Sequence, residues 1–346
     1  MQPPFAERSP DAWSAERKFL LERKIAGMQL RIEGTYLEGL VQRLYQELES
    51  AGMSLRPRVY LSDEWSCPDR VPLIGVPFYL VDPKLTKLED EMMEGVEAET
   101  EEEILAYLRH EAGHAFNYAY KLYESEAWTS LFGSFDAAYL EDYVPRPFSR
   151  NYVRHIPGWY AQKHPDEDFA ETFAVWLTPR ANWRELYAGW GCLKKLEYVD
   201  ELVKQIGRTP PPVTGEDYDI HADIPAWSVQ EHYERTLPKV DPIKIDLDDE
   251  LRELFRARGK RGGNVVPYAA HELLRQHRRS VLRHVAHWTG LYEAWIKALL
   301  EHCIARAQAL DLQADRNHSE DAIAGFTAFV TTLCMNKLYE GDFVAP

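Results

Sequence analysis

The stretch that most constrains the fold is LRHEAGHAFNYAY, residues 108–120, because its two histidines are spaced for a helix. His110 and His114 are four residues apart, so on an α-helix they share one face, about 6 Å apart along the axis. Apolar residues recur around them at helical spacing, and Thr100 and Glu103 form a capping box where the helix would begin. We therefore expect a helix from about residue 100 to residue 120 that directs two imidazoles at one metal ion.

Two other residues of this stretch fit the same interpretation. Glu111 is rotated by about 100° from His110 around the helix, so its carboxylate is free to accept a proton from metal-bound water. Gly113 has no side chain and would let another backbone or a substrate approach the helix. With twelve histidines in the chain, HExxH can also arise by chance, and a catalytic zinc needs a third protein ligand from elsewhere.

A second helix is predicted over HPDEDFAETFAVWLTP, residues 164–179. Pro165 suits its first turn, and three acidic residues there favour the helix dipole. Glu167 and Glu171 share a face of this helix, so one can bind the ion while the other hydrogen-bonds a histidine ligand. The residues alone leave the choice between these two glutamates open.

Other residues near the start of this helix have alternative roles. His164 is a rival ligand because imidazole suits zinc, but a residue immediately before a proline more often marks helix entry. Asp166 and Glu167 could do no more than favour the helix dipole. Asp168 is expected to stabilise the dipole or to lie at the surface.

HEAGH followed by EDFAE resembles the gluzincin peptidases and, most closely, the bacterial family named "putative zinc-binding metallopeptidase". The resemblance covers about residues 100–180. It implies that Glu167 is the third ligand of one Zn²⁺ per chain, beside His110 and His114, with Glu171 as the supporting acid or alternative ligand. It further implies hydrolysis of peptide bonds by a zinc-activated water, with Glu111 as the general base. The interval from His114 to Glu167 is longer than is typical of gluzincins.

Peptide hydrolysis also requires a donor for the oxyanion as it develops. Tyr160 lies seven residues before Glu167, and several gluzincins carry a tyrosine or histidine near this place. We expect its phenol to reach the tetrahedral intermediate, although a buried aromatic side chain is the simpler explanation. His155 is the second candidate donor.

Composition restricts the possible partners. The formal charge of −16 argues against a protein that mainly binds nucleic acid or an anionic membrane, and a neutral or basic substrate fits it better. The peptide or protein substrate is what the resemblance implies. No secretory leader and no run of 18 apolar residues is visible. The four cysteines, Cys67, Cys192, Cys303 and Cys334, are widely spaced and predict neither disulfides nor a thiolate zinc site. We expect a cytoplasmic protein.

The expected architecture is α+β: a helix-rich, zincin-like metallopeptidase domain with a small sheet over residues 1–240, and a helical C-terminal region over residues 241–346. Helices are predicted within residues 11–52, and two or three strands within residues 58–82. Beyond residue 240, helices are predicted over residues 246–258, 268–310 and 319–339. His277, His284 and His287 are interpreted as a solvated helix face beside several arginines.

Two other functions remain open. A catalytically silent zinc-binding protein would keep the ligands but have its cleft occluded by its own chain, for example by the C-terminal helices. A helical interaction protein would hold no metal at all. Natural substrate, cleavage specificity and oligomeric state leave no recognisable pattern in the sequence.

Overall fold

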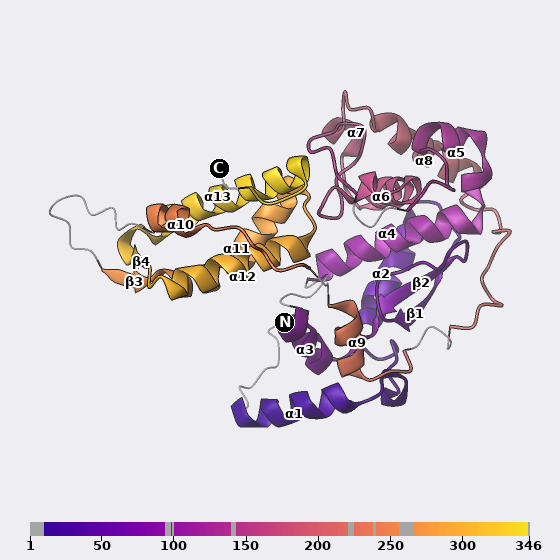
Figure 1. The fold of residues 1–346 in the computed structure, drawn as a ribbon. Coiled ribbons are helices and arrows are strands. Elements are labelled where there is room, and N and C mark those ends of the chain that lie inside the picture. The colour runs from indigo at the N-terminus through magenta and orange to yellow at the C-terminus, as the bar shows by residue number, and fades with distance from the viewer. Residues whose placement is uncertain are drawn as a thin grey trace. The chain divides into compact units, whose positions relative to one another are not determined.

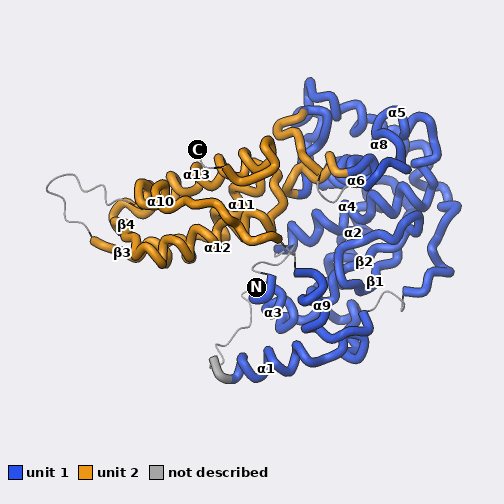
Figure 2. Tube along the Cα trace, viewed as in Figure 1, with its two compact units in different colours: residues 1–139, 150–156, 164–237 blue, residues 140–149, 157–163, 238–346 orange. Residues whose placement is uncertain are grey.

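The computed structural model describes residues 10–93, 98, 100–139, 143–220, 225–237, 240–255 and 266–344. The chain forms two compact units (Figure 2). Unit 1 comprises residues 1–139, 150–156 and 164–237, and unit 2 comprises residues 140–149, 157–163 and 238–346. The chain therefore leaves unit 1 and returns to it twice between residues 139 and 164.

Unit 1 is mainly helical and contains one small sheet (Figure 1). Its elements are α1 (Pro10–Glu22), η1 (Ile25–Met28), α2 (Tyr36–Ser50), β1 (Arg58–Ser62), β2 (Leu73–Pro77), η2 (Phe78–Val81), α3 (Pro83–Met93), α4 (Glu101–Ala119), η3 (Leu122–Glu124), α5 (Glu126–Phe132), α6 (Pro165–Leu177), α7 (Trp183–Leu186), α8 (Leu193–Ile206) and α9 (Val229–Thr236). Strands β1 and β2 pair in parallel, with Tyr60 opposite Gly75.

The helix predicted around HEAGH is α4, and it lies in the core of unit 1. It contacts α6, α2 and β2, and Figure 1 shows it between α6 and α2. The predicted capping box is present, since the Thr100 side chain accepts from the Glu103 backbone N–H while the Glu103 carboxylate accepts from the Thr100 N–H. Almost every α4 residue after Glu103 is buried, so His110, Glu111 and His114 are shielded from bulk water.

The strand prediction for residues 58–82 is only partly correct. The second apolar run, LIGVPFYLVD, pairs as a strand only as far as Pro77 and then continues as the 3-10 helix η2. Proline has no N–H to donate to a ladder, so it is a natural place for the strand to end. Phe78, Tyr79 and Leu80 are buried in the core from this helix rather than from a strand.

Unit 2 has its own apolar core, to which four helices contribute among the residues that the structure describes. Its elements are η4 (Tyr160–Gln162), α10 (Asp248–Leu254), β3 (Pro267–Ala269), α11 (Ala270–Thr289), α12 (Glu293–Ala309), β4 (Gln313–Asp315), η5 (Arg316–His318) and α13 (Ser319–Glu340). Strands β3 and β4 pair in antiparallel fashion and were not predicted. The observed fold is thus α+β and helix-rich, with a small parallel sheet and a helical C-terminal region.

Residues 268–310, predicted to be helical, form two helices, α11 and α12, which are separated at Gly290. Gly290 has φ +70°, a left-handed conformation that ends a helix readily only at glycine. A Cβ there would lie 2.6 Å from the Trp159 ring and 2.7 Å from Pro145. None of the described helices is both long and apolar enough to cross a lipid bilayer.

Candidate metal centre

Close packing of α4 against α6 creates the site, and Gly113 allows it. A Cβ at Gly113 would stand 2.8 Å from the Ala170 Cα and 3.0 Å from the Ala170 carbonyl oxygen. Both atoms belong to the α6 backbone and cannot move aside as a flexible side chain can. The glycine inside HEAGH therefore lets the two helices approach until side chains from each can meet at one point.

Three potential ligand atoms converge between these helices. The Nε2 atoms of His110 and His114 are 3.1 Å apart, and Glu167 Oε2 lies 3.0 Å from the first and 3.2 Å from the second. Tetrahedral zinc with bonds of about 2.0–2.1 Å separates its ligand atoms by about 3.4 Å, so the triangle is close to the right size. Among the described residues, these three form the one group of histidine, cysteine and acidic side chains close enough to hold an ion.

Two carboxylates orient the imidazoles. His110 Nδ1 donates to Glu171 Oε1 at 2.9 Å, and His114 Nδ1 donates to Asp166 Oδ2 at 2.9 Å. Because a carboxylate accepts, each ring carries a proton on Nδ1, so each ring, when it is neutral, can present an Nε2 lone pair to a metal ion between the helices. The second oxygen of Glu171 accepts from the Ile156 backbone N–H at 2.9 Å.

The charges at the site are strongly coupled. Burial opposes protonation of His110, but hydrogen bonds to Glu167 and Glu171 outweigh it and raise its pKa to about 9. Burial likewise opposes protonation of His114, yet the charges of Asp166 and Glu167 raise its pKa. The imidazoles in turn hold the pKa of Glu167 well below its usual value despite burial. A cationic charge is therefore strongly favoured at this point, whether protons or a metal ion supply it.

Glu111 lies beside these ligands on α4 and is only 5% exposed. Burial raises the pKa of its carboxyl to about 7, even though the neighbouring His110 and His114 act to lower it. A carboxylate with a pKa near neutrality both accepts and releases a proton readily at physiological pH, as general acid–base chemistry requires.

Asp166 has a role at the site that the sequence did not predict. Besides His114, its carboxylate accepts from the Asn117 side-chain amide at 2.7 Å and from the Tyr118 hydroxyl. Asn117 and Tyr118 follow His114 on α4. Their hydrogen bonds to Asp166 therefore join α4 to the first turn of α6. Asp166 was interpreted as a dipole contribution, although its position one residue before a candidate ligand was the available signal.

Of the two roles expected for Asp168, helix-dipole stabilisation or a surface position, the surface position is wrong. Asp168 is 2% exposed and accepts from the Lys195 ammonium, which also donates to the Asn151 carbonyl oxygen at 2.9 Å. Burial raises the pKa of Asp168 to about 7 despite the charge of Lys195. This ion pair ties α6 to α8 and to residues 150–156 without touching the ligands.

The remaining candidates lie as follows. His164 is the N-cap of α6: its Nδ1 accepts from the Asp166 N–H, and its Nε2 lies 3.0 Å from the Ala137 carbonyl oxygen. His155 Nε2 lies 3.0 Å from the Ala106 carbonyl oxygen, and burial lowers the pKa of this ring, so its one N–H is engaged.

Tyr160 is in η4 of unit 2, and its role as oxyanion donor stays a prediction. Tyr139, not singled out from the sequence, donates its hydroxyl to Glu167 Oε1 at 2.7 Å.

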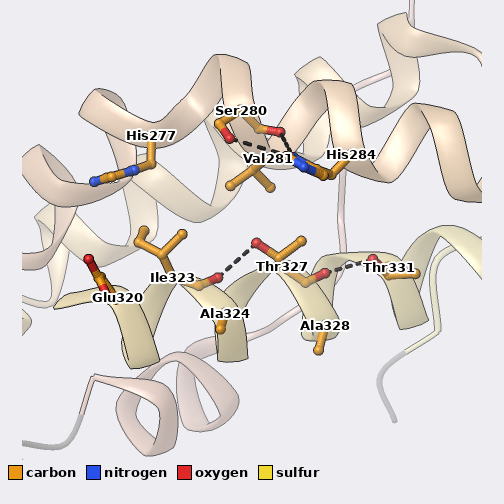
Figure 3. Close-up of a pocket in the computed structure, with 10 residues that line it drawn as sticks. All are labelled: His277, Ser280, Val281, His284, Glu320, Ile323, Ala324, Thr327, Ala328 and Thr331. Atoms are coloured by element: carbon orange, nitrogen blue, oxygen red, sulfur yellow. Dashed lines mark hydrogen bonds between the residues drawn. The ribbon is translucent and has the colours of Figure 1, made fainter. Parts of the chain in front are cut away.

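In unit 2, the histidines of α11 do not form part of a metal group among the described residues. His277 and His284 line an open groove of about 710 Å³ between α11 and α13, opposite Glu320 and Thr327 (Figure 3). His284 Nδ1 donates to the Ser280 carbonyl oxygen of its own helix at 2.7 Å. His284 and His287 are both exposed, as a solvated helix face predicts.

Comparison with known proteins supports the resemblance. Residues 86–187 match a family described as "Putative zinc-binding metallo-peptidase". This interval contains all of α4 and α6, and with them the three atoms that converge. No curated protein and no solved structure matches the chain.

Proposed function

We propose that unit 1 is a zinc-dependent metallopeptidase that hydrolyses peptide bonds in a peptide or protein substrate. The observation that carries this proposal is the convergence of His110 Nε2, His114 Nε2 and Glu167 Oε2 within 3.2 Å of one another, beside the buried Glu111. Two neutral imidazoles and one carboxylate form the donor set of many catalytic zinc sites, with a fourth position for water or substrate. The matched family supports the same class of reaction.

The chain's own side chains would divide the work as follows. His110, His114 and Glu167 would hold one Zn²⁺, with Glu171 and Asp166 fixing the imidazole rings. A zinc ion there supplies Lewis acidity, which makes water a nucleophile at neutral pH and polarises the substrate carbonyl. Glu111 takes one proton from the attacking water on its carboxylate. It then passes that proton to the amine nitrogen as the C–N bond breaks, so the elements of water are divided between the two products.

We retain two further expectations as proposals. Tyr160 is the proposed donor to the oxyanion, and a Tyr160→Phe variant should then lower kcat with little change in KM. Unchanged kcat would assign the tyrosine to packing. The cytoplasm is the proposed location, in keeping with four cysteines that are all unpaired.

The test compares Glu111→Gln with Glu102→Gln, an exposed glutamate on the first turn of the same helix. Zinc content is measured on tag-free protein, and cleavage of a broad peptide library is followed by mass spectrometry. We expect about one zinc per chain in the wild type, in Glu111→Gln and in Glu102→Gln. Cleavage should fall by about 10²–10⁴-fold in Glu111→Gln alone.

Each other outcome points to a different conclusion. Retained cleavage in Glu111→Gln would show that the glutamate is not the base. Zinc without cleavage in the wild type would favour a catalytically silent zinc-binding protein. Less than about a tenth of an equivalent of zinc would favour a helical interaction protein without metal.

A further inference from the structure

The two carboxylate oxygens of Glu167 have different surroundings. Oε2 faces the imidazole pair, at 3.0 Å from His110 Nε2 and 3.2 Å from His114 Nε2. Oε1 accepts a hydrogen bond from the Tyr139 hydroxyl at 2.7 Å. A phenol that donates to a carboxylate makes a charge-assisted hydrogen bond, which is stronger than one between neutral groups. One oxygen is thus directed at the ligand cluster while the other is held by a donor.

Tyr139 is anchored to the same helix that carries Glu167, independently of this bond. Its ring lies 5.3 Å from the ring of His164, the N-cap of α6. His164 holds the chain just before Tyr139 through the contact between its Nε2 and the Ala137 carbonyl oxygen. The same ring accepts the Asp166 N–H on its Nδ1, so the loop and the first turn of α6 are fixed to each other.

We propose that Tyr139 is a positioning residue that confines Glu167 to one-oxygen coordination of the metal ion. This inference rests on the metal site proposed above. A carboxylate can bind a metal through one oxygen or through both. If Oε1 also bound, Glu167 would occupy two positions, and the fourth position of a tetrahedral site would no longer be left to water or substrate. The Tyr139 hydroxyl prevents this by engaging Oε1.

The side chain is suited to a clean test. Tyr139 is 46% exposed, so Tyr139→Phe removes the hydroxyl without leaving a buried cavity. Tyr45→Phe is a matched control, because it removes a phenol that donates to the Pro57 carbonyl oxygen at 2.7 Å, also in unit 1. The full chain is stripped of metal and loaded with Co²⁺, whose visible d–d bands are more intense in four-coordinate than in five-coordinate sites. Zinc affinity is measured in parallel by competition with a chromophoric chelator.

We expect four-coordinate Co²⁺ spectra for the wild type and for Tyr45→Phe. Tyr139→Phe should lose d–d intensity and bind zinc about 10–100-fold more weakly, the usual effect of removing a partner of a metal ligand. An unaltered spectrum in Tyr139→Phe would overturn the inference, even if the affinity fell. A wild-type spectrum that is already five-coordinate would overturn it as well. Failure of the wild type to bind either metal would instead refute the metal site itself.

Discussion

Replacing Asp166 by asparagine should weaken metal binding while leaving all three proposed ligands in place. The carboxylate accepts from His114 Nδ1 at 2.9 Å, from the Asn117 amide at 2.7 Å and from the Tyr118 hydroxyl. An asparagine side chain has one acceptor oxygen and one NH₂ group. Its NH₂ cannot accept from His114 or Asn117, so at least one buried donor loses its partner. His114 also loses the negative charge that makes its ring more basic.

The size of the effect follows from the role of such partners. Loss of a carboxylate behind a metal-bound histidine costs about 10–100-fold in metal affinity. At about 1.36 kcal/mol per factor of ten, this corresponds to about 1.4–2.7 kcal/mol. Isothermal titration of apoprotein with zinc in a competing chelator measures the change directly.

Asp168→Asn is the matched control, since it makes the same substitution two residues along the same buried helix. Asp168 contacts Lys195 and not the ligands, so its loss should leave zinc affinity within about twofold of the wild type. It should instead destabilise the fold by on the order of 3 kcal/mol, because the buried Lys195 ammonium loses its counter-charge. If Asp166→Asn changed zinc affinity no more than Asp168→Asn, the orienting role assigned to Asp166 would be wrong.

Four further predictions concern packing, pH and metal binding. Gly113→Ala should force α4 away from the Ala170 backbone, which should lower the free energy of unfolding by about 1–3 kcal/mol in urea titrations and weaken zinc binding. Gly39→Ala on α2 should do neither, because Gly39 has open space around it. Equal effects of the two substitutions would contradict the packing argument. The pKa of His110, raised to about 9, means that protons compete with zinc, so apparent zinc affinity should rise with pH up to about 9 and then level off; a flat profile would contradict this. In the metal-free protein the same raised pKa contributes stability that is complete below about 6.5 and is lost as pH rises through about 9, which thermal melts of the apoprotein would detect. Zinc at about 100 times its dissociation constant should stabilise the fold by about 2.7 kcal/mol relative to chelated protein, and identical melting curves would refute binding to the native state.

Local signals predicted the two helices that build the site. The capping box at Thr100 and Glu103 and the proline at the first turn of α6 act within a few residues, so they can be read without knowledge of the fold. The helical spacing of His110 and His114 works in the same way. The role of Gly113 was also correctly anticipated, because a missing side chain predicts close approach, although only the structure identifies Ala170 as the neighbour.

Contacts between distant segments could not be predicted. Tyr139 meets Glu167 because the chain after α5 returns to the N-terminus of α6, and Asp168 meets Lys195 because α8 packs against α6. Neither pairing has a spacing rule in sequence. The long interval between His114 and Glu167 has a structural explanation. Two segments of this interval, residues 140–149 and 157–163, belong to unit 2. The break at Gly290 was missed because an isolated glycine is tolerated within many helices.

The most direct test of the metal centre is the anomalous diffraction of crystals grown with zinc, recorded at the zinc absorption edge. We predict one strong peak per chain, within about 2.0–2.2 Å of His110 Nε2, His114 Nε2 and Glu167 Oε2. A peak bound instead by Glu171 or His164, or no peak between α4 and α6 at all, would contradict the assignment of these three residues as ligands.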